Sequence, residues 1–252
     1  VKPVHFCVMN GKSSIGSGWR KRVHTIMSRM WIKNPNGVWS NNFRHCFPKQ
    51  GLLPKRVRGS LTDEEYCWVI DPLDGTSNYI HDMAPYSVSI ALRDREELLL
   101  GVVYEVCRNE CFYAWKGGKA FMNGEEIHVS NVEDIKDAFV ITELPYNHLQ
   151  YKQTALHLID QLYGVVGGIR MNGSAAAAIC YVAIGRFDAW MEAFLGKWDY
   201  SAAALIVQEA GGKVTDFYGE DHFIEGHHII ATNGNLHPVF QKLLSEVPPL
   251  NM

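Results

Sequence analysis

The sequence predicts a mixed fold of the α/β (α+β) class, and three observations support this prediction. Strand-like and helix-like stretches alternate from residue 66 onward, as a layered α/β or α+β protein requires. Hairpin turn signals separate the early strands, whereas alanine-rich helices appear later in the chain. With 252 residues, of which 47% are hydrophobic, the chain is long enough to bury one large core or two smaller ones around a shared cleft.

We expect two intimately packed halves, about residues 1–137 and about residues 138–252, because no repeat or low-complexity linker separates them. The first half should hold an antiparallel sheet of four or five strands with turns at Gly117-Gly118 and Asn123-Gly124. Its stretches, in order, are a strand at 66–70, two strands within 86–106 and hairpins within 110–130.

The second half alternates strands with helices. Its helix beginning at Asp199 is expected to have this residue at its N-cap and Gly211-Gly212 at its end. The elements, in order, are a strand at 138–144, a helix at 151–164, a glycine turn at 165–173, a helix at 174–185, a strand at 187–193, a helix at 199–212, strands at 213–217 and 227–233, and a helix at 236–247.

The charge distribution is uneven along the chain. Residues 1–58 contain 12 of the 24 Lys and Arg residues and none of the 27 Asp and Glu residues, so they carry +12 and the remainder carries 12 − 27 = −15. Three interpretations compete for this segment: a nucleic-acid-binding extension, an Arg- and Ser-containing organelle transit peptide, or a stretch that is not the gene's intended product.

Cysteine usage and hydropathy indicate a cytoplasmic protein that does not enter a membrane. The six cysteines are scattered, and the close pair Cys107 and Cys111 has no second pair to complete a zinc site. No apolar run approaches the ~18 residues that a membrane span needs, and the N-terminus lacks the order of a secretory signal. Free thiols in a reducing compartment are therefore expected.

Two aspartates, Asp71 and Asp74, stand at the end of the strand in "WVIDPLDGTSNY". Two ionised carboxylates a few Å apart repel each other unless a cation lies between them, and oxygen ligands suit Mg²⁺. Gly75 and Thr76 would let the backbone approach a ligand, with N–H groups directed at an anion. The alternative is an N-cap with a solvated neighbour. For Asp199 in "WDYSAAALIVQEAGG", the N-cap alternative is also open when this residue is considered alone.

Taken together, these two segments resemble the inositol monophosphatase family of Mg²⁺-dependent phosphatases. "DPLDGTSNY" fits the family's D-P-[IL]-D-G-T-x-N-[FY] motif, and "WDYSAAALIVQEAGG" fits its second acidic motif. The segment "RMNGSAAAAICYVAIGRFDAWME" is similar to the family's R-x-x-G-[ST]-A-A helix and acidic strand end. The resemblance covers about residues 64–240 and implies a layered α-β-α-β-α sandwich of the inositol monophosphatase and fructose-1,6-bisphosphatase type.

The resemblance also implies roles for individual residues. Asp71, Asp74, Asp199 and the Leu73 carbonyl would be ligands of Mg²⁺, and Thr76, together with Asp74, would act on the attacking water. Contacts with the substrate are implied for Leu73, Asp74, Gly75, Thr76, Gly173, Ser174, Ala175, Glu192 and Asp199. Bound cations would lower the pKa of a water and neutralise developing charge, so that no covalent enzyme intermediate is needed.

The expected reaction is hydrolysis of a small phosphate monoester, with inositol-1-phosphate as the leading substrate. Relatives on this scaffold that act on fructose bisphosphate, histidinol phosphate or 3′-phosphoadenosine phosphate keep other substrates open, and Pro145, Tyr146 and Asn147 depart from the inositol-selective pattern. A nucleophilic-aspartate phosphatase is disfavoured, because its two aspartates are two apart and here they are three apart. Lithium sensitivity and a homodimer are implied by the resemblance alone.

Residues 1–58 depart most from the family. The family supplies a metal-ligating glutamate upstream of the first motif, but this chain has no carboxylate before Asp63. Met30-Trp31-Ile32 must be encoded ATG-TGG-ATN, and reading from the third base gives Val-Asp. With permissible codons, the shifted frame reads HDYVSYVDKESER and later GFITEEGT, which places glutamates at the positions of Lys55 and Arg56.

We therefore expect residues 1 to about 58 to be a frameshifted reading of an ordinary family member that rejoins the family frame near Gly59. If the printed frame is the real one, the site lacks its glutamate and activity should be weak or absent. A third hypothesis, from another class, is an inactive scaffold or nucleic-acid-binding protein that uses the +12 segment, although the acidic remainder would compete for that segment.

Overall fold

The computed structural model describes the backbone of residues 31–33, 39–41 and 51–54, and residues 66–144, 152–225 and 228–245. Much of the segment to which the frame hypothesis applies therefore lies outside the described residues. No helix in the described part is long and apolar enough to cross a membrane.

The first sheet has seven strands in the order β3-β4-β5-β6-β7-β8-β9, of which β3 and β4 run parallel and all other neighbours antiparallel. The expected antiparallel sheet is therefore present. Its strands are β3 (Gly51–Pro54), β4 (Cys67–Asp74), β5 (Ser87–Arg93), β6 (Leu98–Glu105), β7 (Glu110–Trp115), β8 (Ala120–Met122) and β9 (Glu125–Ile127). A separate antiparallel pair joins β1 (Trp31–Lys33) to β2 (Trp39–Asn41).

The second sheet has five strands in the order β11-β10-β12-β14-β13. The central strand β12 is parallel to β10 and antiparallel to β14. The strands are β10 (Phe139–Thr142), β11 (Gly168–Arg170), β12 (Ala189–Ala193), β13 (Lys213–Thr215) and β14 (His228–Thr232). The short strand β11 lies where the sequence predicted only a glycine turn.

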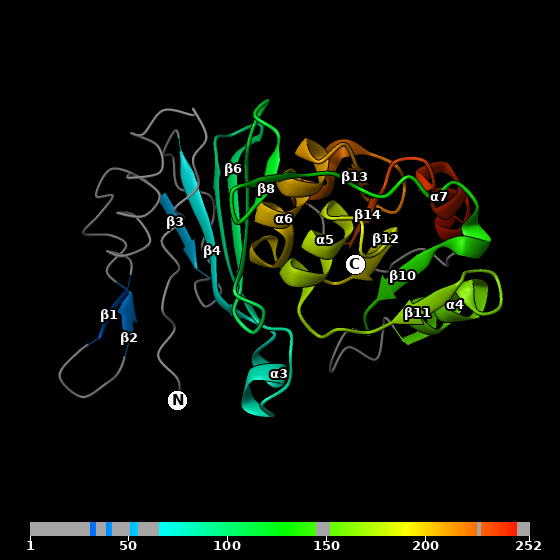
Figure 1. The fold of residues 1–252 in the computed structure, drawn as a ribbon, viewed down its shortest axis with the longest axis horizontal. Helices are drawn as coiled ribbons and strands as arrows, with labels where there is room; N and C mark the ends of the chain where they lie inside the picture. The colour runs from blue at the N-terminus through cyan, green and yellow to red at the C-terminus, as the bar shows by residue number, and fades with distance from the viewer. Residues whose placement is uncertain are drawn as a thin grey trace.

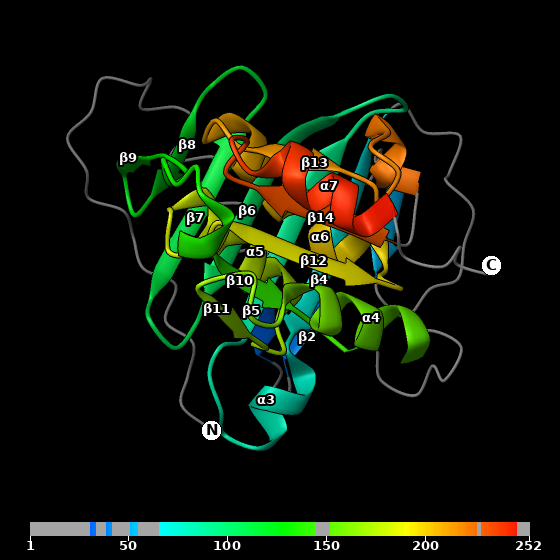
Figure 2. The same cartoon turned by 90° about the vertical axis from the view of Figure 1, so that its right-hand side faces the viewer.

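Helices α5 (Ala175–Ala183) and α6 (Lys197–Glu209) lie between the two sheets, while α4 (Lys152–Leu162) and α7 (His237–Ser245) cover the outer face of the second sheet (Figures 1 and 2). Short helical segments are α3 (Thr76–Ile80), η1 (Ile135–Asp137) and η3 (Asp221–Glu225). The described layers are thus sheet, helices, sheet, helices. This arrangement confirms the predicted layered α/β class, and four of the five layers of the predicted α-β-α-β-α sandwich are present among the described residues. The division into halves at about residue 137 stays a prediction.

Helix α6 packs so closely on the first sheet that a side chain at one position of β6 has no room. A Cβ atom added to Gly101 would lie 2.3 Å from the carbonyl oxygen of Ala202 in α6. Ala202, Ala203 and Ala204 are fully buried, so the small residues of this helix allow the close packing. The position of α6 is therefore determined by backbone contact with the sheet.

The start of α6 differs from the prediction. The helix begins at Lys197 with Gly196 at the N-cap, so Asp199 is the third helical residue and not the N-cap. The Asp199 carboxylate instead accepts the N–H of Gly196 at 2.9 Å. A carboxylate at this position satisfies a free donor of the first turn and interacts favourably with the helix dipole.

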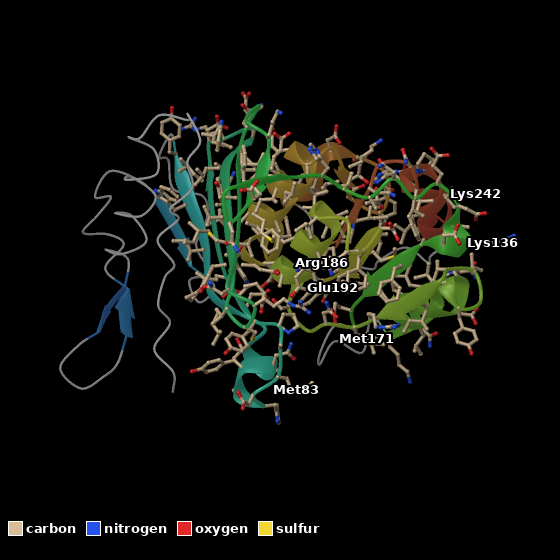
Figure 3. The ribbon with its side chains drawn as sticks, viewed as in Figure 1. Met83, Lys136, Met171, Arg186, Glu192 and Lys242 are labelled. Atoms are coloured by element: carbon tan, nitrogen blue, oxygen red, sulfur yellow. The ribbon has the colours of Figure 1, made fainter. Side chains whose placement is uncertain are left out.

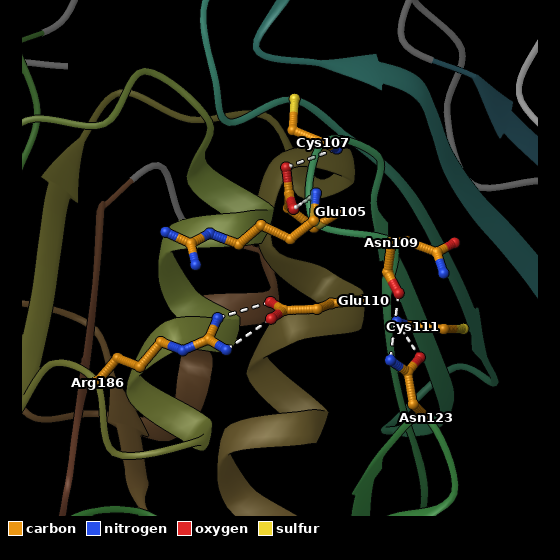
Figure 4. A network of polar contacts seen from close by, with 8 residues as sticks. Glu105, Cys107, Asn109, Glu110, Cys111, Asn123 and Arg186 are labelled. Carbon is orange, nitrogen blue, oxygen red and sulfur yellow. Dashed lines mark hydrogen bonds and ion pairs between the residues drawn. The ribbon is translucent and has the colours of Figure 1, made fainter.

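An ion pair joins the end of the α5 segment to the first sheet. Arg186 donates from its two terminal nitrogens to the two carboxylate oxygens of Glu110 in β7, each at 2.6 Å (Figure 4). Contact with Glu110 raises the pKa of Arg186 above its ordinary value. Because the pairing is bidentate, it fixes the relative orientation of two elements distant in sequence.

Candidate metal and phosphate site

A β-bulge explains how Asp71 and Asp74 come to face the same side of β4. In a regular strand, residues three apart point to opposite faces. Here Asp71 pairs with Ser89 and Asp74 pairs with Ser87, and the register shifts between the two pairs. Two residues of β4, including Pro72, therefore oppose one residue of β5. The extra residue restores the facing of Asp74, and proline is tolerated at a bulge because it has no N–H to pair.

Asp199 completes a cluster of three carboxylates. One oxygen from each of Asp71, Asp74 and Asp199 lies within 4.8 Å of the others. Oxygen ligands of Mg²⁺ stand about 2.0–2.1 Å from the ion, so ligands on opposite sides are about 4.2 Å apart. The three side chains therefore match the donor type of a hard divalent cation and nearly match its spacing. Asp71 and Asp74 are buried, which makes their mutual repulsion costly without a cation.

The Asp74 carboxylate is oriented by contacts from β5 and from the start of α5. Its Oδ2 atom accepts the Ser174 hydroxyl at 2.5 Å, the Ala176 N–H at 3.0 Å and the Ser87 hydroxyl at 3.3 Å. Ser174 is the N-cap of α5 and Ala176 lies in its first turn, whereas Ser87 begins β5. Asp74 thus occupies the position of an anion at a helix N-terminus.

The predicted water-orienting residue, Thr76, contacts the predicted ligand Leu73. The Thr76 hydroxyl donates to the Leu73 carbonyl at 2.9 Å, and the Leu73 N–H donates to Asp71 Oδ1 at 3.0 Å. With its hydrogen used in this way, the Thr76 oxygen can accept a hydrogen bond from a water. The structure therefore brings Asp71, Leu73, Asp74, Thr76 and Asp199 together, and their roles stay predictions.

Gly75 precedes α3 in a left-handed conformation with φ of +78°. A Cβ atom here would lie 3.0 Å from the Pro85 carbonyl and 3.1 Å from the Ser174 Cβ. Glycine is consequently required both by backbone conformation and by the close approach of α5. This packing puts the loop between β4 and α3 directly against the predicted substrate-facing turn.

That turn, from Gly173 to Ala175, also depends on its neighbours. Gly173 has a φ of +74°, and a Cβ atom on it would lie 2.8 Å from the Asn78 side-chain oxygen. Ser174 is the N-cap of α5 and Ala175 is its first residue, both buried. The sequence placed these three residues beside the substrate, and the structure places Ser174 on Asp74.

Two buried glutamates approach the carboxylate cluster from the second sheet. Glu192 lies near the end of β12, toward the middle of the molecule (Figure 3), and is 9% exposed. Burial raises its pKa well above the usual range, and Glu143, Asp199 and Asp74 raise it further. Glu192 is therefore not a solvated charge at the end of a strand.

Glu143 was missed as a site residue by sequence reasoning. It follows β10 directly and is 8% exposed. Burial raises its pKa, whereas hydrogen bonds from the N–H groups of Asn172 and Gly173 oppose the rise. The sequence feature that could have identified Glu143 is its position immediately after an apolar strand. Pro145, Tyr146 and Asn147, on which the substrate prediction partly depended, lie outside the described residues.

A layered α/β fold with three carboxylates gathered where a bulged strand meets a helix defines a class of proteins equipped to hold a divalent cation through oxygen ligands. The chain belongs to the inositol monophosphatase family, whose sequence model matches residues 46–248. This is a phosphatase family, and its assignment confirms the resemblance found in the motifs.

Individual relatives carry two kinds of name. The chain is 38% identical to the Nus factor SuhB of Pseudomonas aeruginosa over 211 residues, which cover 82% of this chain and 77% of the relative. It is also 38% identical to an inositol-1-monophosphatase of Caulobacter vibrioides over 200 residues, 76% of each chain.

Solved structures agree with the fold. An inositol monophosphatase from Anabaena (Nostoc) superposes with a TM-score of 0.75 at 34% identity, covering 82% of both chains. The inositol monophosphatase of Thermotoga maritima superposes with a TM-score of 0.72 at 29% identity, covering 90% of this chain and 93% of that one.

Proposed function

We propose that the protein hydrolyses a small phosphate monoester in a Mg²⁺-dependent reaction, with inositol-1-phosphate as the leading substrate. The observation that carries this proposal is the convergence of Asp71, Asp74 and Asp199 within 4.8 Å beside the Thr76 hydroxyl's contact with Leu73. Bound Mg²⁺ would lower the pKa of a water and neutralise charge on the phosphate and the leaving alkoxide.

Residues of the chain would bind the cation, orient the attacking water and bind the phosphate. The three aspartates and the Leu73 carbonyl would hold the cation, and the Thr76 oxygen would accept a hydrogen bond from the attacking water. Backbone N–H groups at Gly75 and Thr76 would bind the phosphate oxygens. These assignments follow the motif match and the side-chain positions described above.

A polyol is the substrate class that the alcohol side of the site favours. Among the described residues no hydrogen-bond donor contacts the buried carboxyl group of Glu192, and a hydroxyl of the substrate would satisfy it. The relative named inositol-1-monophosphatase supports the same choice. Fructose bisphosphate, histidinol phosphate and 3′-phosphoadenosine phosphate are the alternatives within the family.

The direct test is phosphate release from inositol-1-phosphate with and without Mg²⁺. We expect release only with the metal, inhibition by Li⁺, and loss of turnover in Asp199→Asn. A panel containing the three alternative substrates under the same conditions would rank them. Metal-independent release, or none from any substrate in the panel, would reject the proposal.

Size measurement in solution would test the proposed homodimer, and cell fractionation would test the proposed cytoplasmic location.

A binding role is the second candidate, because several similar proteins are named Nus factors and residues 1–58 carry +12. In this alternative the chain would bind nucleic acid or serve as a scaffold without turnover. Salt-dependent nucleic-acid binding together with absent phosphate release would favour it over hydrolysis.

The frame hypothesis bears directly on activity. Strands β3 and β4 are parallel, and their register ends with Pro54 opposite Ile70, one residue before Lys55 and Asp71 in their respective sequences. A glutamate encoded at position 55 would thus follow the strand beside the first metal aspartate. Resequencing the DNA tests the hypothesis. If the DNA confirms the printed frame and the purified protein has the mass of the printed sequence, residues 1–58 are not a reading error.

A further inference from the structure

Two side chains from different parts of the fold form hydrogen bonds with the turn that precedes α5. On one side, Glu143 Oε1 accepts the N–H groups of Asn172 at 2.6 Å and Gly173 at 2.9 Å. On the other side, the Asn78 amide donates to the Asn172 carbonyl at 2.7 Å and to the Pro85 carbonyl at 2.8 Å. We call Glu143 and Asn78, which contact the same peptide group, the turn clamp.

The two members of the turn clamp come from the two parts of the fold that the site joins. Asn78 lies in α3, directly after the strand that carries Asp71 and Asp74, whereas Glu143 follows β10 in the second sheet. A buried hydrogen-bond acceptor is costly to leave without its donors. Glu143 is buried, so loss of its two N–H donors would be unfavourable.

The clamped turn leads straight into the groups that orient Asp74. Ser174 and Ala176 follow Gly173, and they donate to the same Asp74 oxygen. Movement of the Asn172–Gly173 peptide would displace both donors together, because Ser174 directly follows Gly173 and Ala176 is only two residues further along. The side chain of Asp74 would then lose the contacts that set its direction toward Asp71 and Asp199.

We propose that Glu143 is a positioning residue of the phosphatase site: together with Asn78 it fixes the Asn172–Gly173 turn, and through that turn it orients the Asp74 carboxylate. The effect of Glu143 on catalysis rests on the proposed function, whereas its contacts with the turn can be tested without measuring activity. Glu143 acts here through its ability to accept hydrogen bonds, and its charge is not required.

The test compares Glu143→Ala with Glu143→Gln in the full chain. Both N–H groups bond to one oxygen of Glu143, so the glutamine carbonyl can keep them, whereas alanine cannot. By NMR-detected amide exchange, we expect the Ala176 N–H to exchange about tenfold faster or more in Glu143→Ala and within about threefold of the parent in Glu143→Gln. Titration with Mn²⁺ should show the same ranking of metal affinities.

Asp188→Asn is the matched control. Asp188 is also a buried carboxylate, which accepts the Phe139 N–H at 2.6 Å and the Ser130 hydroxyl. It precedes β12 and lies about 13 Å from Glu192 along that strand, at about 3.3 Å per residue. Loss of a buried acceptor there should lower stability but leave Ala176 exchange and Mn²⁺ affinity unchanged.

Asn78→Ala provides an independent measurement if Glu143→Ala does not fold, because it removes the other side of the turn clamp and should also speed Ala176 exchange. Unchanged Ala176 exchange in Glu143→Ala, or in Asn78→Ala, would overturn the inference, as would a Glu143→Gln variant as impaired as Glu143→Ala. Failure of the proposed function is seen separately, as absence of Mg²⁺-dependent phosphate release by the parent protein.

Discussion

At the scale of single residues, Asp74 illustrates how a candidate ligand depends on groups far away in sequence. Its Oδ2 atom receives hydrogen bonds from Ser87, Ser174 and Ala176, and the latter two are about one hundred positions away. Each donor lowers the cost of burying the carboxylate. The direction of this side chain is therefore a property of the assembled site and not of the strand that bears it.

Gly75 gives a residue-scale prediction. Gly164 has nearly the same φ, +77° against +78°, but a Cβ atom there would meet nothing within 4 Å. Gly164→Ala should therefore cost only the left-handed backbone strain, about 1–2 kcal/mol. Gly75→Ala should cost more, because its Cβ would press on the Pro85 carbonyl and on Ser174.

Thermal unfolding and Mn²⁺ titration of both variants would check this prediction. Only Gly75→Ala should weaken metal binding, since only this substitution displaces Ser174 from Asp74. Equal effects of the two substitutions on metal affinity would show that close packing at Gly75 is irrelevant to the site.

At the scale of elements, the β4 bulge and the α6 N-terminus bring the candidate ligands together. The bulge turns two aspartates at a spacing of three to one face of the sheet, and the first turn of α6 delivers the third carboxylate. Neither feature requires an unusual residue apart from Pro72. Sequence motifs identified the aspartates, while the bulge and the true helix start came from the pairing of β4 with β5 and the packing of α6.

His237 provides an element-scale prediction about stability and pH. It begins α7, and its two ring nitrogens lie 3.0 Å from the hydroxyls of Thr215 in β13 and Thr232 in β14. Burial, with a smaller contribution from Lys213, lowers the pKa of His237 to about 4. The ordinary pKa of histidine is about 6.5.

Above pH 6.5 this histidine is neutral in the folded and unfolded chains and adds no pH dependence. As pH falls below 6.5, His237 becomes protonated in the unfolded chain but stays neutral in the folded chain. The free energy of unfolding should therefore fall progressively until about pH 4. The melting temperature of His237→Gln should be lower than that of the parent at pH 7 but should fall less steeply between pH 7 and 5. His128→Gln, a substitution at an exposed histidine, should keep the parent slope, and an unchanged slope in His237→Gln would contradict the assignment.

At the scale of the whole molecule, contact between α6 and the first sheet fixes the distance from Asp199 to the other two aspartates. Gly101→Ala would drive a Cβ atom to within 2.3 Å of the Ala202 carbonyl oxygen. Overpacking usually lowers the free energy of unfolding by about 1–3 kcal/mol. Because the clash here is with the backbone, we expect a loss at or above the upper end of this range. Urea unfolding should show this loss, and Mn²⁺ affinity should fall with it because α6 carries Asp199.

The second substitution Ala202→Gly should not restore either property in Gly101→Ala, because the clash involves the carbonyl oxygen and not the alanine side chain. Recovery of stability in the double variant would show that the methyl group of Ala202 makes the limiting contact. Parental metal affinity in Gly101→Ala would show that the position of α6 does not control the site.

The frame hypothesis leads to a further prediction for the whole chain. In the protein of the printed sequence, Lys55→Glu should tighten Mn²⁺ binding about tenfold or more, because it replaces a cation with a potential oxygen ligand at the residue after Pro54, and Pro54 pairs with Ile70, the residue before Asp71. Lys49→Glu makes the same change of net charge elsewhere in the segment and is the control. Equal effects of the two substitutions would indicate a general charge effect and count against the missing-ligand hypothesis.

The sequence by itself determined the family, the alternation of strands and helices, and the choice of Asp71, Asp74 and Asp199 as candidate metal ligands. It could do so because long motifs and hydrophobic periodicity are local properties of the chain. Only the tertiary structure decided that Asp199 is the third residue of its helix, that Glu192 is buried, and that Glu143 and Asn78 hold one turn. The turn, for example, depends on contacts between residues 29 to 94 positions apart in the sequence. Their energy arises from burial and hydrogen bonding between packed layers, which no local pattern encodes.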